Sequence, residues 1–262
     1  MDLSRLKLAE IRRLLAEKDP DAALLEALAR DPRAGAREIY RLQARRLERA
    51  ASEAGRVESL FREEFALVRR GYEYIAGVDE AGRGPLAGPV VAAAVILPVP
   101  AMIPGLDDSK RLAAPVRERV AADVLRQASA WGIGLASVEE IDDINILRAS
   151  LLAMRRALAV MGTAPQWVLV DGSTPIADLP WPQRPLVGGD ATSASVAAAS
   201  VLAKVFRDRL MEEADLQYPA YGFAAHKGYA TKAHYRALAR WGPCPLHRRA
   251  FLPAPSLFPD MS

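Results

Sequence analysis

Short apolar runs that end on acidic side chains, beside glycine or a turn, are the feature that most constrains this 262-residue chain. The runs span residues 72–78, 167–170 and 185–187, and the acids that follow them are Asp79, Glu80, Asp171 and Asp190. Apolar runs of this length, bounded by turn residues, are typical of buried strands. Because α/β proteins build their sites at strand ends, the pattern predicts an α/β domain whose acids gather at one place.

Two further apolar runs, residues 90–97 and 131–136, predict the remaining strands. Helical spacing follows in three stretches, which are residues 111–130, 139–161 and 193–217. Strands that first follow one another and then alternate with helices favour a mixed five-stranded sheet flanked by helices. We place this domain at residues 71–262, with its α/β layers at about 71–245 and a helical tail after them.

Residues 1–70 predict a separate, Arg-rich helical extension. Leu8, Ile11 and Leu15 recur at helical spacing, and Pro20 opens a second helix. This stretch holds 16 basic and 13 acidic residues, whereas residues 71–262 hold 19 of each, so the net charge of +3 lies in the extension. Two interpretations remain open: a small helical cap with a solvated charged face, or an arm that grips nucleic acid.

Composition excludes several classes of protein. The single cysteine, Cys244, cannot form an internal disulfide, which agrees with a reducing compartment. Residues 85–106 carry no charge, but their five prolines exclude a membrane-spanning helix. Because the first residues have no apolar core of the signal-peptide kind, we expect a soluble, cytoplasmic protein.

The acids predict a metal site. Four carboxylates brought together repel one another, and a pair of Mg²⁺ or Mn²⁺ ions, which prefer oxygen ligands, relieves that repulsion. Two such ions suit the in-line cleavage of a phosphodiester. The alternative is that each acid caps a helix or turn. The sequence has no His/Cys cluster, so zinc is not expected.

Phosphate contacts are predicted at two kinds of position. In Gly82-Arg83-Gly84, the glycines allow a sugar-phosphate to approach the backbone and the guanidinium can bind phosphate. Neither a Walker loop nor a dinucleotide-binding loop is present. The chain has 29 arginines but only six lysines. Four of these lysines lie in segments with other polar residues or glycine, which suggests that the chemistry requires an ammonium group there. The alternative is chance placement. These lysines are Lys110, Lys204, Lys227 and Lys232.

Taken together, the motifs resemble prokaryotic ribonuclease HII, over about residues 74–255. The residues that carry the resemblance are 77–91, Asp108-Ser109-Lys110, Val170-Asp171-Gly172, Gly189-Asp190, 198–205 with Arg207-Asp208, Tyr221-Gly222-Phe223, His226-Lys227-Gly228-Tyr229 and 247–251. Residues 1–70 resemble only the helical extension of some bacterial members. One departure is Gly188, where many members have lysine, which removes a positive charge beside Asp190.

The resemblance implies a ribonuclease H-like fold and two Mg²⁺ or Mn²⁺ ions held by Asp79, Glu80, Asp171 and Asp190, with Asp79 bridging both. It implies substrate contacts from Gly82, Arg83, Gly84, Lys110, Lys204, His226, Lys227 and the substrate-sensing Tyr229. Asp208 is interpreted as a helix ion pair or cap. The remaining histidines are interpreted as packing or surface residues.

The implied activity is endonucleolytic cleavage of RNA in RNA/DNA hybrids and 5′ of single ribonucleotides embedded in duplex DNA, by a monomer. The roles that follow are ribonucleotide excision and primer removal. Two alternatives are a ribonuclease HIII-type enzyme and a catalytically silent protein that only binds hybrids. Ribonuclease HIII typically has threonine where this chain has Arg83, and a catalytically silent hybrid-binding protein would not need four intact acids.

Overall fold

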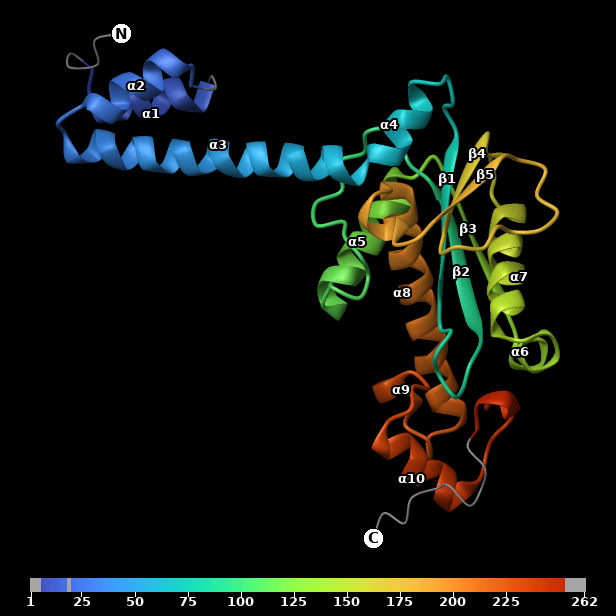
Figure 1. The fold of residues 1–262 in the computed structure, drawn as a ribbon. Helices are drawn as coiled ribbons and strands as arrows, with labels where there is room; N and C mark the ends of the chain where they lie inside the picture. Colours follow the sequence, from blue (N-terminus) through green and yellow to red (C-terminus); the bar gives the residue numbers. More distant parts are fainter. Residues whose placement is uncertain (1–5, 18–19, 253–262) are drawn as a thin grey trace. The chain divides into compact units, whose positions relative to one another are not determined.

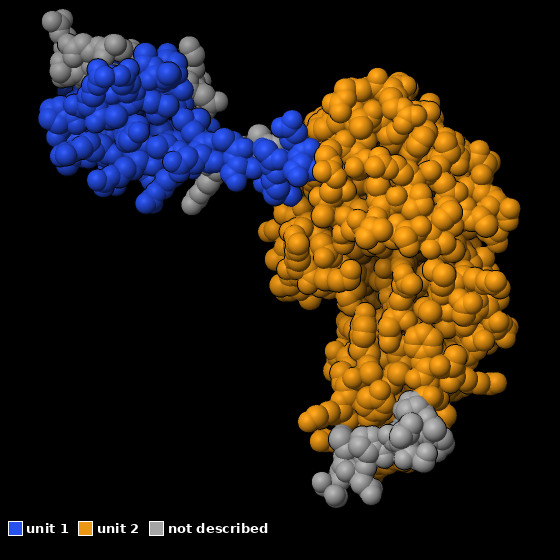
Figure 2. Space-filling view, viewed as in Figure 1, with its two compact units in different colours: residues 1–59 blue, residues 60–262 orange. Residues whose placement is uncertain are grey.

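The computed structural model describes residues 6–17 and 20–252. The part of the predicted tail beyond residue 252 lies outside the described residues. Contacts divide the chain into two compact units, residues 1–59 and residues 60–262, which Figure 2 colours separately. Each unit has its own apolar core and is described by itself below.

The first unit is helical, as the sequence predicts. It contains α1 (Leu8–Glu17), α2 (Ala22–Arg30) and nearly all of α3 (Ala34–Leu60). Asp21 caps α2 by accepting a hydrogen bond from the Leu24 amide. The buried core of the unit consists of Ile11, Leu15, Leu28, Ala36 and Ile39. The charged residues between these positions cover the outside, which is the usual pattern of an amphipathic helix.

The second unit is built on a mixed five-stranded sheet, which confirms the predicted fold class (Figure 1). Its strands are β1 (Ile75–Ala81), β2 (Val90–Ile96), β3 (Ala130–Ala136), β4 (Trp167–Asp171) and β5 (Gln183–Leu186). They lie in the order β3-β2-β1-β4-β5. Strands β1, β2 and β3 pair antiparallel, whereas β4 runs parallel to both β1 and β5.

Two long helices cover opposite faces of the sheet (Figure 1). Helix α8 (Ala194–Gln217) packs on β1 and β2, and α7 (Ile146–Ala159) packs on β3 and β2. Both helices approach the strands closely where the strands have glycine. A Cβ on Gly77 would lie 2.2 Å from the Ser195 carbonyl carbon, and one on Gly134 would lie 2.2 Å from the Ala153 carbonyl oxygen. Glycine is therefore needed for this packing.

The second unit has five further helices among its described residues, the longest of which is as long as α7. They are α4 (Arg62–Val68), α5 (Ala114–Gln127), α6 (Val138–Ile144), α9 (Phe223–His226) and α10 (Lys232–Trp241), with 3₁₀ turns η1 (Gly189–Ala191) and η2 (Arg249–Phe251). Helix α4 belongs to the second unit, where Leu67 packs with Ile75 and Val196. No helix among the described residues is long and apolar enough to cross a membrane.

The structure corrects two details of the sequence-based prediction. Asp79 and Glu80 lie inside β1 rather than beyond it, because their backbones continue the ladder opposite Ala93 and Ala92 of β2. The predicted helix over residues 139–161 is two helices, α6 and α7. Asn145 separates them with a φ of 69°, and its side chain caps the start of α7.

Candidate active site

Strand register brings Asp79 and Asp171 together. Val78 pairs with Val170 in the parallel β1–β4 ladder, so the next residues, Asp79 and Asp171, occupy neighbouring positions. Side chains on paired strands alternate together between the two faces of a sheet. Asp79 lies on the face covered by α8, on the same side of β1 as Gly77. Both carboxylates therefore point toward α8 at one end of the sheet.

Asp79 is the most enclosed of the four acids, with only 5% of its surface exposed. Burial, together with the negative charges of Glu80 and Asp171, raises the pKa of Asp79 well above its ordinary value. The nearby Ser200 side chain of α8 favours the charged carboxylate and partly offsets this rise in pKa. The Ser200 and Ser109 hydroxyls are 2.8 Å apart, so the loop before α5 is tied to the same point.

Glu80 points to the other face of β1 and turns back toward Arg83. The Arg83 guanidinium lies 3.1 Å from Glu80 Oε1. Burial raises the pKa of Glu80, and the nearby Arg83 opposes that rise. The negative charge of Asp171 also raises the pKa of Glu80, so these acids interact with one another.

Asp190 joins the group from the turn η1. Asp171 Oδ1 accepts a 2.9 Å hydrogen bond from the Gly189 amide, which ties this turn to the end of β4. Burial, followed by the charges of Asp108 and Asp171, raises the pKa of Asp190. Lys110 opposes that rise, so it supplies a positive charge near Asp190 in a chain that has Gly188 instead of lysine.

Lys110, which the sequence predicts to contact substrate, lies close enough to the acids to interact with them electrostatically. Partial burial lowers its pKa, but the carboxylates of Asp108, Asp79, Asp190 and Asp171 outweigh burial and raise the pKa overall. The four predicted acids and Lys110 are thus brought together at one end of the sheet.

The donor set suits a hard divalent cation. All four groups offer carboxylate oxygens, and the raised pKa values of Asp79, Glu80 and Asp190 show that their charges are poorly compensated by the chain alone. Among residues 6–17 and 20–252, no three Asp, Glu, His or Cys side chains are already arranged as metal ligands. Binding would therefore require side chains to reorient, for example Glu80 away from Arg83.

Two buried arginines, to which the sequence analysis assigned no role, hold the Gly82–Gly84 loop. Arg248 donates hydrogen bonds to the carbonyls of Gly82, Arg83, Pro85 and Gly88. Arg207 of α8 donates to the carbonyls of Ala87, Pro89 and Lys227. Gly82 has a φ of 100°, and a Cβ there would lie 2.1 Å from the Arg207 side chain. The loop conformation therefore depends on both glycine and arginine.

Tyr229 lies beside this loop. The Leu86 amide donates to the Gly228 carbonyl at 2.9 Å, so the two segments are hydrogen-bonded neighbours. The Tyr229 ring is 41% exposed and is flanked by two cations. Lys204 Nζ lies 5.7 Å and Arg207 Cζ 5.8 Å from the ring centroid. The exposed part of this ring is available to a ligand.

The other predicted contact residues make internal bonds. Lys204 pairs with Asp208 at 2.6 Å, in agreement with the helix ion pair expected for Asp208. Lys227 pairs with Glu212 at 2.8 Å. Both ring nitrogens of His226 bond to backbone, Nε2 with the Tyr221 carbonyl and Nδ1 with the Gly228 amide. His226 and Lys227 therefore support the Tyr229 segment and are not gathered with the acids.

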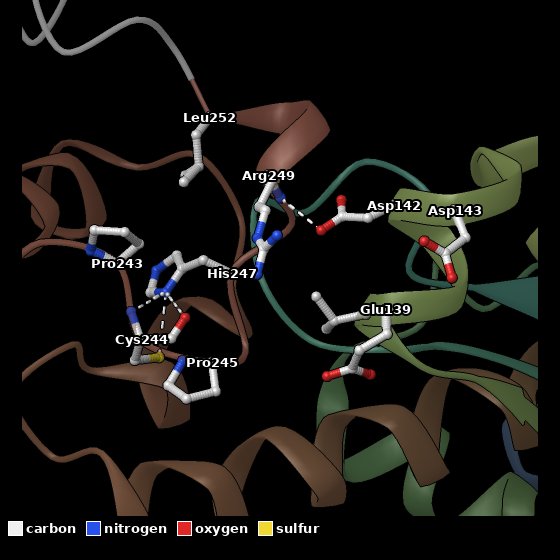
Figure 3. A pocket seen from close by; sticks show the side chains of 10 residues that line it. Glu139, Asp142, Asp143, Pro243, Cys244, Pro245, His247, Arg249 and Leu252 are labelled. Carbon is white, nitrogen blue, oxygen red and sulfur yellow. Dashed lines mark hydrogen bonds between the residues drawn. The ribbon is translucent and has the colours of Figure 1, made fainter.

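A cavity of about 440 Å³ lies between α6 and the C-terminal segment (Figure 3). The Asp142 carboxylate on its wall accepts hydrogen bonds from the Arg249 and Ala250 amides. Across the cavity, the Cys244 amide donates to His247 Nδ1 at 2.9 Å. These bonds fix the backbone on either side of Arg248, so the cavity walls help to hold the arginine that supports the Gly82–Gly84 loop.

His234 and His247 are buried packing residues, as expected. Their Nε2 atoms lie 3.0 Å apart, and His226 stacks on His234. Burial lowers the pKa of His234 from 6.5 to about 4. Because the folded pKa is depressed, the protein is stabilised above pH 6.5, and this contribution is lost as the pH falls toward the folded pKa.

We expect the free energy of unfolding to fall by about 2 kcal/mol from His234 alone between pH 7.5 and pH 5. Urea unfolding of the wild type and of His234→Gln at both pH values measures this contribution. The variant should lose less stability than the wild type over this interval. An equal loss in both proteins would contradict a neutral, buried His234.

Comparisons with known proteins agree with this architecture. A ribonuclease H2 from Pyrococcus horikoshii is similar, with a TM-score of 0.55 and 27% identity over 67% of this chain and 92% of that one. The fold of a Bst ribonuclease HIII in complex with Mn²⁺ is similar too, with a TM-score of 0.52 and 18% identity over 68% of this chain and 65% of that one. The mixed sheet and its flanking helices thus define a ribonuclease H-like fold.

Sequence comparison gives the particular family. The ribonuclease HII family model matches residues 76–253, and the model of the ribonuclease HII N-terminal domain matches residues 7–67. A ribonuclease HII of Pelotomaculum thermopropionicum is 53% identical over 254 residues, covering 96% of this chain and 95% of the relative. This chain belongs to the ribonuclease HII family and is a ribonuclease H endonuclease.

Proposed function

We propose that this enzyme cleaves the RNA strand of RNA/DNA hybrids, and cuts 5′ of single ribonucleotides in duplex DNA, by a two-metal-ion mechanism. The observation that carries the proposal is the convergence of four interacting carboxylates at one end of the sheet. The Mn²⁺ in the Bst ribonuclease HIII supports a divalent ion in this fold. The cellular roles that follow are ribonucleotide excision and primer removal.

Asp79, Glu80, Asp171 and Asp190 would hold two Mg²⁺ or Mn²⁺ ions, and Asp79 is the most buried of these four ligands. When bound, such ions activate water and stabilise the leaving 3′-oxygen. The chain contributes the arrangement: Asp79 and Asp171 come from adjacent parallel strands, and Gly189 ties the Asp190 turn to Asp171. Lys110 balances charge while no cation neutralises the acids.

Recognition of the ribonucleotide is assigned to the Gly82–Gly84 loop and Tyr229. The 2′-hydroxyl distinguishes RNA from DNA, and glycine backbones allow a sugar to approach closely. A Cβ on Gly84 would meet no atom within 4 Å, so this part of the loop has space beside it. The exposed Tyr229 ring next to the loop can pack on a neighbouring sugar.

A cleavage assay on a labelled RNA/DNA hybrid tests the proposal against a silent hybrid-binding protein. With Mg²⁺ or Mn²⁺ we expect products ending in 3′-hydroxyl and 5′-phosphate groups, and with excess chelator we expect none. Binding without cleavage in the presence of either ion would favour the silent protein. Ribonuclease HIII typically has threonine at the position of Arg83, so Arg83 argues against an enzyme of that related type.

The first unit is proposed to assist binding through phosphate contacts. Arg37, Arg41 and Arg45 lie exposed on successive turns of α3, so they form a basic stripe. Deletion of residues 1–59 should weaken hybrid binding. It should also make the dependence of log affinity on log salt shallower, reducing the magnitude of the slope by about 2–3. Binding titrations at several salt concentrations measure this slope.

A matched pair of substitutions controls for unspecific charge loss. Arg41→Gln should lower the slope by about 1, whereas Arg30→Gln should lower it less, because Arg30 is already paired with Glu26 at 2.5 Å. Equal slopes for wild type, Arg41→Gln and the deletion would identify the first unit as a structural cap.

A further inference from the structure

Glu64 is a buried glutamate that the proposed chemistry does not use. It lies on α4, outside the part of the chain matched by the ribonuclease HII model, and none of its surface is exposed. Burial of an ionisable group in an apolar region is costly unless specific hydrogen bonds compensate for lost water. Its neighbours indicate which part of the molecule those bonds hold.

Glu64 Oε1 accepts two hydrogen bonds from the start of α8. The Ser193 hydroxyl donates at 2.6 Å and the Ser195 amide at 2.9 Å. Ser193 is also the N-cap of α8, and its side chain accepts from the Val196 amide. A carboxylate acceptor at the first turn of a 24-residue helix satisfies a free amide and interacts favourably with the helix dipole.

The segment held in this way carries Asp190. Only Ala191 and Thr192 separate Asp190 from Ser193. The Ser193 amide donates to the Gly189 carbonyl at 2.8 Å, and the Glu63 amide donates to the Thr192 carbonyl at 3.4 Å. The turn is therefore fixed at one end to Asp171 through the Gly189 amide and at the other end to α4 through Glu64.

Asp190 depends on this backbone for its position. Its side chain interacts with Asp108 and Lys110, which lie in a loop, whereas its main chain is set by the two attachments of the turn. Loss of the Glu64 attachment would allow the start of α8 and the Asp190 turn to shift relative to Asp79 and Asp171. A small displacement of one ligand weakens a site that needs several oxygens at fixed distances.

We propose that Glu64 is a positioning residue that sets the placement of Asp190 relative to the other acids, an inference that rests on the proposed metal site. Glu64 thereby supports the catalytic centre indirectly, from the region matched by the N-terminal domain model. Glu63 acts nearby by pairing with Arg184 of β5 at 2.8 Å.

The test compares Glu64→Ala, Glu64→Gln and Leu158→Ala in the full chain. Gln keeps an acceptor oxygen for Ser193 and Ser195, whereas Ala removes it. Leu158 is a buried residue of α7 that packs in the core against the sheet, so Leu158→Ala destabilises the fold away from α4. The readouts are Mn²⁺ binding by calorimetry without substrate, the metal concentration for half-maximal cleavage, and the melting temperature.

Glu64→Ala should weaken Mn²⁺ binding and raise the half-maximal metal concentration by about 5- to 10-fold, with Glu64→Gln within about 2-fold of wild type. Leu158→Ala should lower the melting temperature but leave metal dependence unchanged. Wild-type Mn²⁺ affinity in Glu64→Ala would overturn the proposal. If Glu64→Ala does not fold, Ser193→Ala removes the hydroxyl donor and is judged by the same criteria.

Asp190→Asn separates this inference from the proposed function. Loss of Mn²⁺ binding in Asp190→Asn combined with wild-type binding in Glu64→Ala would refute only the positioning role. Wild-type binding in Asp190→Asn would refute the metal site itself.

Discussion

Asp79→Asn is expected to lower the rate of hybrid cleavage by about 10³-fold or more, which corresponds to about 4 kcal/mol of transition-state stabilisation. Asp79 is the most buried of the four acids and lies beside Asp171, so an amide at this position would remove a negative charge from the centre of the proposed metal site. Initial rates under saturating Mg²⁺ measure the loss. A residual rate above a tenth of wild type would contradict the assigned role.

The same variant should be more stable than wild type without metal. The pKa of Asp79 is raised in the folded state, so its ionised form opposes folding at neutral pH. The gain from Asn should be present at pH 7.5 and shrink as the pH falls through the folded pKa, where Asp79 is itself neutral. Each kcal/mol gained raises the melting temperature of a domain of this size by about 2–4 °C. If Asp79→Asn melted at a lower temperature than wild type at pH 7.5, misfolding would explain its lost activity.

Tyr229→Ala is expected to lose about 5- to 200-fold in kcat/KM on a single ribonucleotide embedded in DNA, and less on a long RNA/DNA hybrid. The nucleotide 3′ of an embedded ribonucleotide has no 2′-hydroxyl, so a flat ring can pack on its sugar without crowding. Tyr229 is exposed, and Lys204 and Arg207 lie near its ring. Tyr229→Phe should retain much of the preference.

The ratio of kcat/KM for the two substrates separates recognition from packing. Tyr235→Ala serves as the control, because Tyr235 is partly buried and packs on the small core around Phe223, whereas Tyr229 is exposed. It should slow both substrates equally. An unchanged ratio in a folded Tyr229→Ala protein would exclude the sensor role.

Strands could be predicted from the sequence because their apolar runs are short and bounded by turn residues. All five predicted strands are present, and the mixed sheet follows from their order. Asp79 and Glu80 were expected beyond β1, since acids are disfavoured in strands. Pairing with Ala92 and Ala93 on one side and with β4 on the other overrides that local preference.

The four acids could be singled out from the sequence because each follows a strand-like run, and the family resemblance agrees with them. The residues that support them could not. Arg248 reaches carbonyls more than 150 positions away, and Glu64 bonds to Ser193 and Ser195 across the fold. Along the chain, Glu64 lies in a charged stretch that is typical of a solvated helix face, and only tertiary packing buries it.

Digestion of duplex DNA that contains one ribonucleotide tests the central claim most directly. With Mg²⁺ or Mn²⁺, the wild type should cut once, on the 5′ side of the ribonucleotide, and leave 3′-hydroxyl and 5′-phosphate ends, while Asp171→Asn should leave the duplex intact. Cleavage on the 3′ side, cleavage that persists in chelator, or an intact duplex under conditions that cut a long hybrid would contradict the account.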